Sequence, residues 1–181
     1  MEHTMQIAVF GGGCFWCTEA IFDELRGVVS VMPGYAGGNT EDPTYHKVSS
    51  GNTGHAEVVR IEYDSEKISY TDLLSVFFAT HDPTTKNRQG ADIGTEYRSL
   101  ILYVNENQKK EAETFVAKLN QTGTAVVTGI EPLGTFYTAE EYHKKYYQNN
   151  ATAPYCQIVI SPKLEKLREK FSALLKKPEE K

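Results

Sequence analysis

The chain has 181 residues, of which 40% are hydrophobic and 11% aromatic, enough for one folded domain with a substantial core and marginal for two. A net charge of −5 argues against a broad nucleic-acid-binding surface, and no apolar run approaches the ~18 residues of a membrane span. Residues 1–10 contain no Lys or Arg and lack the long apolar stretch of a secretory signal, so we expect a cytoplasmic protein.

The first half of the chain alternates between strand and helix patterns. A short buried strand is expected at 6–10, before three glycines, and residues 14–25 then have apolar side chains at helical spacing. The later elements expected in this half are a strand at 28–35, a polar loop at 38–55, a strand at 57–63, and a helix that begins at Ser69 and carries Leu73, Leu74, Phe77 and Phe78.

The second half continues in the same way after a polar loop at 80–98. The elements expected there are a strand at 99–104, a helix capped by Asn105, a strand at 125–130, a short Tyr-rich helix capped by Thr138 with Glu141, a strand at 158–160, and a terminal helix carrying Leu164 to Leu175. The two long loops are longer than compact connections need, which is typical of functional segments.

This alternation predicts one α+β domain over residues 1–181. We expect a core at about 6–162 and a C-terminal helix at about 162–177. The expected architecture is a two-layer sandwich, a mixed β-sheet flanked by helices, of the ferredoxin-like or α-β plait type.

The strongest chemical signal is Cys14, which follows Gly11-Gly12-Gly13 and opens a predicted helix. Unpaired N–H groups and the helix dipole can lower the pKa of a thiol placed there from about 8.5 to roughly 3.5–7.5. Cys17 lies one helical turn further on, and Cys156 is the third cysteine. We therefore expect Cys14 to be a reactive thiolate.

Three other interpretations of these residues stay open at this point. The glycine-rich loop could bind phosphate, although it lacks the Gly-Lys-Ser/Thr ending. The cysteines could simply be buried in the core. Cys14, Cys17, Cys156 and one His could also bind zinc, but a lone Cys-x-x-Cys pair is a weak metal signal. We expect neither a metal nor another cofactor.

Five stretches, in order, resemble the A-type peptide-methionine sulfoxide reductases, which act on the S epimer of the sulfoxide. They are Gly13-Cys-Phe-Trp-Cys17 with Glu19 and Phe22, Pro33-Gly-Tyr-Ala-Gly-Gly38, Pro43-Thr-Tyr45 with Gly51-Asn-Thr-Gly-His-Ala-Glu-Val58, His81-Asp-Pro-Thr-Thr85 with Asn87-Arg-Gln-Gly90 and Tyr97-Arg-Ser99, and Ala139-Glu140 with His143 and Tyr155-Cys156.

The resemblance implies a role for each matching residue. Cys14 is the nucleophile, Glu57 the proton donor, and Phe15 and Trp16 hold the substrate's methyl group. Tyr45, Tyr97 and Asp92 complete the expected catalytic set. The sulfoxide sulfur becomes electrophilic when its oxygen is protonated, so an acid beside a thiolate suits the reaction. Glu57 can be that acid if burial raises its pKa.

Attack by Cys14 releases methionine and leaves a sulfenic acid, which a second thiol converts to a disulfide. Family members often use a C-terminal cysteine, which favours Cys156 slightly over Cys17. However, residues 157–163 look ordered, and Cys17 stands where many members have Gly, so either thiol, or a relay through both, remains open.

The resemblance implies free or protein-bound methionine-S-sulfoxide as substrate, protein repair after oxidative damage as the role, and thioredoxin as reductant of the disulfide. We expect a monomer that binds neither nucleic acid nor membranes. The main alternative is a general thiol–disulfide oxidoreductase using Cys14 and Cys17. A non-enzymatic module that binds metal or oxidised methionine is the second.

Overall fold

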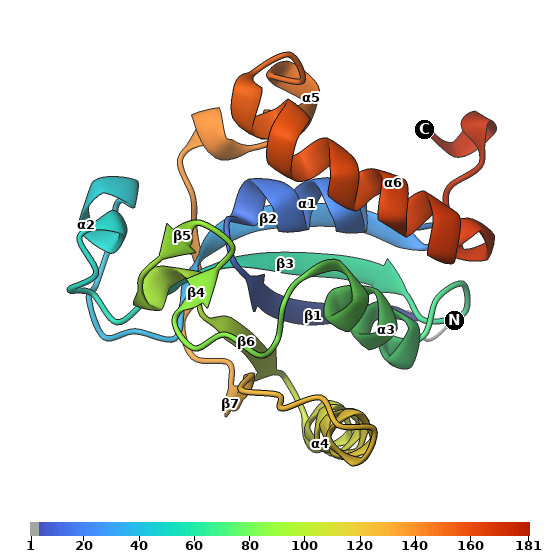
Figure 1. The fold of residues 1–181 in the computed structure, drawn as a ribbon, viewed down its shortest axis with the longest axis horizontal. Coiled ribbons are helices and arrows are strands. Elements are labelled where there is room, and N and C mark those ends of the chain that lie inside the picture. Colours follow the sequence, from blue (N-terminus) through green and yellow to red (C-terminus); the bar gives the residue numbers. More distant parts are fainter. Residues whose placement is uncertain (1–3) are drawn as a thin grey trace.

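The computed structural model describes residues 4–181 and has one mixed β-sheet at its centre (Figure 1). The six strands of this sheet lie in the order β7-β6-β1-β3-β2-β8. They span Gly129–Pro132, Ser99–Tyr103, Met5–Gly12, Ala56–Asp64, Val28–Ala36 and Tyr137–Thr138. Every pair is antiparallel except β6 with β7, which is parallel. The expected α+β fold with a mixed sheet is therefore confirmed.

The helices gather on one face of the sheet. Side chains of each strand point alternately to the two faces, and the larger set of apolar side chains points toward the helices. Phe10, Ile61 and Ile101 point into the larger core, which also holds the apolar faces of the helices. The helices are α1 at Phe15–Asp23, α3 at Tyr70–Thr80, α4 at Glu106–Gln121 and α6 at Ser161–Lys170. Val58 and Leu102 point to the opposite face, where Leu133 and Phe136 cover a smaller core. This is the expected two-layer arrangement.

Both polar loops contain short elements that apolar periodicity does not predict. Helix α2 spans Tyr45–Ser49, and the Thr44 side chain accepts a hydrogen bond from Lys47 N to cap it. In the second loop, β4 (Arg88–Gln89) and β5 (Asp92–Ile93) form a small hairpin, followed by a 3-10 turn at Thr95–Tyr97. Each element is too short for periodicity to reveal it.

Four expected elements differ in the C-terminal third. The strand expected at 125–130 is β7, which begins only at Gly129 and ends at Pro132. Residues 156–160, expected to end in a strand, form a π-helical segment that continues directly into α6. Thr138 lies in β8 and caps no helix; a 3-10 turn at Glu141–His143 and α5 at Tyr146–Asn149 follow. Helix α6 ends at Lys170, well before residue 177. None of the helices in residues 4–181 is long and apolar enough to cross a membrane.

Candidate active site

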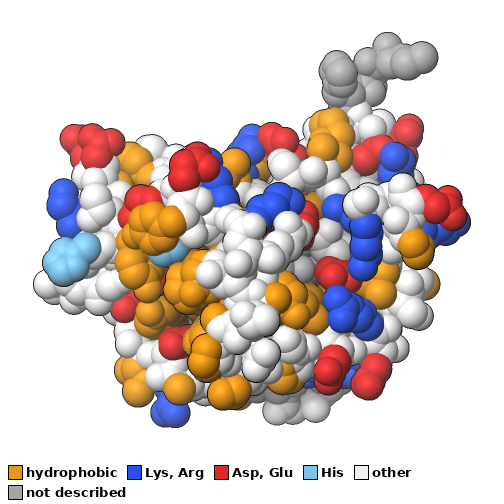
Figure 2. Space-filling view, turned by 90° about the horizontal axis from the view of Figure 1, so that it is seen from above, with side chains coloured by type: hydrophobic (Ala, Val, Ile, Leu, Met, Phe, Trp, Pro, Cys, Tyr) orange, Lys and Arg blue, Asp and Glu red, His pale blue; other side chains and the backbone are white. Residues whose placement is uncertain are grey.

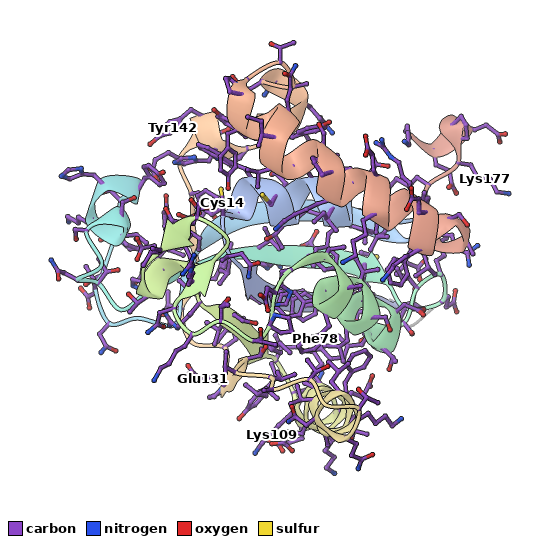
Figure 3. The ribbon with its side chains drawn as sticks, in the orientation of Figure 1. Cys14, Phe78, Lys109, Glu131, Tyr142 and Lys177 are labelled. Carbon is purple, nitrogen blue, oxygen red and sulfur yellow. The ribbon has the colours of Figure 1, made fainter. Side chains whose placement is uncertain are left out.

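Cys14 lies at the N-terminus of α1, directly after the central strand β1 (Figure 3). The chain turns there through Gly13, whose φ of +96° favours glycine, and a Cβ at this position would lie 2.6 Å from Gln89 Cγ. The carbonyl of Cys14 accepts the first helical hydrogen bonds, from Cys17 N and Thr18 N. The Cys14 side chain is almost buried, with 9% of the residue exposed.

The two cysteines of α1 influence each other's pKa. Burial, the neighbouring Cys17 thiol and the nearby Glu57 raise the pKa of Cys14. The Cys14 thiol is the main cause that lowers the pKa of Cys17 to about 7, against the effect of burial. Burial therefore opposes the effect of the helix N-terminus on Cys14, and a thiolate on Cys14 stays a prediction.

Glu57 lies on β3 and is 1% exposed. Burial raises the pKa of its carboxyl to about 8, even though Glu57 Oε1 accepts a hydrogen bond of 3.1 Å from Phe15 N. Glu57 therefore keeps its proton at neutral pH and can donate it. The same hydrogen bond connects the acid to the first residue of α1, next to Cys14.

Tyr45 and Tyr97 come from the two loops, as the first residue of α2 and the last residue of the 3-10 turn. Burial and then the nearby Glu57 raise the pKa of both phenols, and Cys14 contributes to both shifts. Both hydroxyls thus stay protonated and can donate hydrogen bonds near the acid and the thiol.

Phe15 and Trp16 are held by aromatic side chains and one histidine. Phe15 is 1% exposed, and its ring centre lies 5.0 Å from that of His143. Half-buried Trp16 stacks on Tyr146 at 3.7 Å, and its Nε1–H donates to His143 Nδ1 at 3.0 Å. Because His143 Nδ1 is the acceptor, its remaining proton is on Nε2, a buried atom that has no hydrogen-bond partner within residues 4–181.

Asp92 reaches the cysteines through Tyr155, a residue that sequence reasoning used only to locate Cys156. Tyr155 Oη donates to Asp92 Oδ2 at 2.9 Å and lies 3.8 Å from Cys17 Sγ. Asp92 is therefore connected to Cys17 through the hydroxyl of Tyr155. The position of Tyr155 in a motif was the one signal that could have identified it.

Cys156 is fully buried in the π-helical segment, where its carbonyl accepts a hydrogen bond from Ser161 Oγ. Burial, followed by the nearby Cys17, raises the pKa of its thiol. All three cysteines are free thiols. Among residues 4–181 there is no group of three or more His, Cys, Asp and Glu side chains placed to bind a metal ion.

The remaining motif residues hold the loops in place. Glu140 accepts hydrogen bonds from Tyr35 Oη, Tyr45 N and Tyr142 Oη, so one carboxylate joins β2, α2 and the segment before α5. His55 accepts from Gly38 N. His81 bonds Phe77 O and Ser99 Oγ and lies outside the Glu57 and tyrosine cluster.

Comparison with known proteins gives a consistent result. A sequence model of the family described as peptide methionine sulfoxide reductase matches residues 6–175. "Peptide methionine sulfoxide reductase MsrA" of Acinetobacter baumannii is 55% identical over 172 residues, covering 95% of this chain and 99% of that protein. A relative from Natronomonas pharaonis with the same name is 54% identical over 168 residues, covering 91% of this chain and 94% of that protein.

Solved structures agree with the sequence comparison. Mxr1 of Saccharomyces cerevisiae in reduced form aligns with a TM-score of 0.78 and 34% identity, covering 84% of this chain and 89% of Mxr1. Mxr1 in complex with Trx2 aligns at 0.54 and 26% identity, covering 78% and 84% of the two chains. The chain belongs to the peptide methionine sulfoxide reductase family.

Proposed function

We propose that this protein reduces methionine-S-sulfoxide, free or in polypeptides, with Cys14 as the nucleophile. One observation carries the proposal: Cys14 and Cys17, one turn apart at the start of α1, lie beside buried Glu57, which accepts a hydrogen bond of 3.1 Å from Phe15 N and whose pKa is raised to about 8, so a thiol proton and a carboxyl proton are both at hand. Two protons are the number needed for the sulfoxide oxygen to leave as water. Names and structures of relatives from bacteria, archaea and yeast support the same activity.

The first half-reaction begins when the Cys14 proton passes to Cys17. The Cys14 thiolate attacks the sulfoxide sulfur while Glu57 protonates the oxygen, and Tyr45 and Tyr97 donate hydrogen bonds to that oxygen. Methionine leaves, and the oxygen remains on Cys14 as a sulfenic acid. Phe15 and Trp16 form the apolar wall for the methyl group.

The second half-reaction forms a disulfide. We propose Cys17 as the resolving thiol, because it lies one helical turn from Cys14 and the two thiols shift each other's pKa, whereas Cys156 is enclosed in a continuous helical segment. The Cys17 proton passes to the Glu57 carboxylate, the resulting thiolate attacks the Cys14 sulfur, and the hydroxyl takes that proton and leaves as water. Asp92 acts through Tyr155 on the Cys17 side of the site.

The disulfide must then be reduced from outside, and we propose thioredoxin as the reductant. Support comes from the solved complex of a related protein, Mxr1, with Trx2. Repair of oxidised proteins is the corresponding role. Three free cysteines fit a cytoplasmic location.

We also propose that the fold is of the α-β plait type. Its four central strands follow the order β6-β1-β3-β2, and each is antiparallel to its neighbours in the sheet. Helix α1 lies between β1 and β2 in the chain, and α3 lies between β3 and β6. This gives the strand-helix-strand repeat of that architecture.

The test is a comparison of four reduced proteins: wild type, Cys14→Ser, Cys17→Ser and Cys156→Ser. Each is incubated with a peptide carrying racemic methionine sulfoxide, and the epimers are separated by chromatography. We expect wild type to consume the S epimer with dithiothreitol or thioredoxin, and Cys14→Ser to consume neither epimer. Cys17→Ser should keep one turnover but lose at least ten-fold with thioredoxin, while Cys156→Ser stays near wild type.

Two results would contradict the proposal. If wild type leaves both epimers intact but reduces a protein disulfide, the general thiol–disulfide oxidoreductase is the better assignment. If Cys156→Ser, and not Cys17→Ser, loses thioredoxin-supported turnover, then Cys156 is the resolving thiol and the π-helical segment must open during catalysis.

A further inference from the structure

Cys17 borders a small cavity on the side of α1 that faces α3 and α6. The cavity measures about 10 Å³, close to the space one water needs. Its lining comes from the end of β1, the buried face of α1, the end of α3 and the first turn of α6. The lining residues are Gly12, Cys17, Thr18, Ile21, Phe22, Phe77, Thr80, His81 and Lys163.

An open groove lies on the outer side of the same wall. It runs between the end of α3, the loop at 82–89 and the start of α6, and its volume is about 500 Å³. Thr80, His81 and Lys163 line both the groove and the cavity. Lys166, one turn further along α6, lines the groove alone, so Lys163 is the cation that reaches from the surface to the Cys17 cavity.

Lys163 is half-buried, yet it takes part in none of the ion pairs found within residues 4–181. Its neighbours differ: Arg168 pairs with Glu24, and Lys145 with Asp23. Figure 2, which looks down on α5 and α6, shows basic and acidic side chains interspersed over this surface. A half-buried ammonium without a counterion costs free energy unless an anion forms nearby.

Among the charged and titratable groups described around Cys17, Lys163 is the one that carries a positive charge. Cys14, Tyr155 and Cys156 are neutral at rest, and Asp92 and any charge on Glu57 oppose a thiolate. Burial lowers the pKa of His81 to about 4, so this imidazole is neutral at pH 7. The pKa of Cys17 is lowered first by the neighbouring Cys14 thiol and then by Lys163 and Tyr155.

The sulfenic acid changes this balance, because Cys17 then carries the proton received from Cys14 and must lose it before it can attack. We propose that Lys163 is a positioning residue for the second half-reaction: its ammonium holds the Cys17 thiolate during attack on the Cys14 sulfenic acid. This inference rests on the proposed function. The Cys17 proton passes to the Glu57 carboxylate, the S–S bond forms, the S–O bond breaks, and the hydroxide leaves as water with that proton.

The test separates the two half-reactions in one turnover. Reduced protein is mixed with excess methionine-S-sulfoxide without reductant and quenched in acid. Methionine and the Cys14–Cys17 disulfide are then quantified by chromatography and mass spectrometry. For Lys163→Met, loss of one pKa unit of thiolate stabilisation should slow disulfide formation about five-fold at pH 7. Methionine should form within two-fold of the wild-type rate. At pH 9, where loss of the Glu57 proton slows both proteins alike, the difference in disulfide formation between Lys163→Met and wild type should disappear.

Two matched variants make the result specific. Lys166→Met removes a lysine from the same helix and groove and should behave as wild type. Lys163→Arg keeps the positive charge and should restore disulfide formation at pH 7. Normal disulfide formation in Lys163→Met overturns the proposal, and so does an equal slowing of both products that persists at pH 9, which would indicate structural damage.

The design also distinguishes failure of the underlying function. Absence of methionine in the wild type would reject the reductase activity itself. Methionine with a disulfide that contains Cys156 instead of Cys17 would reject the choice of resolving thiol, and with it the role of Lys163.

Discussion

Glu57 shows how one buried carboxyl serves catalysis at a cost in stability. An exposed glutamate titrates near 4.3, whereas burial raises the pKa of Glu57 to about 8. Between these values the folded chain holds a proton that the unfolded chain has released. Stability from this group is therefore present at low pH and is lost as pH rises through about 8.

We expect Glu57→Gln to remove this pH dependence while it removes the proton donor. At pH 9 the variant should be more stable than wild type by a few kcal/mol, since one pKa unit corresponds to about 1.4 kcal/mol. Its rate of sulfoxide reduction should fall by about 10²-fold or more. Urea unfolding at pH 6 and pH 9, with single-turnover assays at pH 7, would check both parts. Equal stability differences at the two pH values would contradict the assignment.

Sequence reasoning named Cys14, Glu57, Tyr45 and Tyr97 as site residues, and the structure brings them near one another. Glu57 contributes to the raised pKa of both phenols. The mutual pKa shifts of Cys14 and Cys17 could not be predicted, because they depend on how deeply β1 and α1 bury the two thiols. Lys163 gave no signal either, since only the packing of α6 brings it to Cys17.

At the scale of elements, the turn after β2 depends on Gly38. A Cβ at this position would lie 2.3 Å from His55 N and 2.5 Å from both Gly54 C and Thr53 O. These atoms are backbone of the segment that leads into β3, so they cannot move without shifting Glu57. Gly38 thus brings the end of the Pro33–Gly38 motif against the Gly51–Val58 motif, although an expected polar loop at 38–55 separates the two in the sequence.

Gly38→Ala should therefore destabilise the fold by roughly 2 kcal/mol or more, because it forces a backbone clash. Gly134→Ala is the matched control, since nothing lies within 4 Å of its Cβ, and it should stay within about 0.5 kcal/mol of wild type. Denaturant midpoints of the two variants give the comparison. Similar midpoints would mean that the turn adjusts more easily than its contacts indicate.

Prediction of helices and strands succeeded where the periodic pattern of apolar residues was long and failed where it was short. The capping box of Ser69 with Asp72 starts α3 as expected. The β-branched residues Ile158, Val159 and Ile160 suggested a strand, but burial of Ile160 and Leu164 four residues apart makes this stretch continue the helix. At residues 158–160, tertiary packing therefore outweighs the local propensity for a strand.

At the scale of the whole molecule, the C-terminal tail is held against the segment that follows α1. Beyond α6, Leu174 O accepts a hydrogen bond from Arg26 N, and Lys176 N donates to Glu24 O, each at 2.8 Å. Leu175 forms a β-bridge with Leu25 at the end of α1. None of these residues belongs to the candidate site.

Truncation after Lys170 should thus lower stability by a few kcal/mol and leave catalysis intact at low temperature. Truncation after Lys177, which keeps the Leu175 bridge, is the control and should cost much less. Thermal unfolding and sulfoxide reduction at 20 °C would measure the two effects. Loss of activity at 20 °C in a folded truncated protein would show that the tail acts on the site as well.

The stacked indole of Trp16 has one more consequence. It is the single tryptophan of the chain, and it lies between Cys14 and Cys17 with its ring against Tyr146. Intrinsic fluorescence excited at the indole band therefore arises from one place, two residues along the chain from the reacting Cys14. Each turnover should carry its own optical signal, so that the sulfenic acid and disulfide stages can be followed in unlabelled protein.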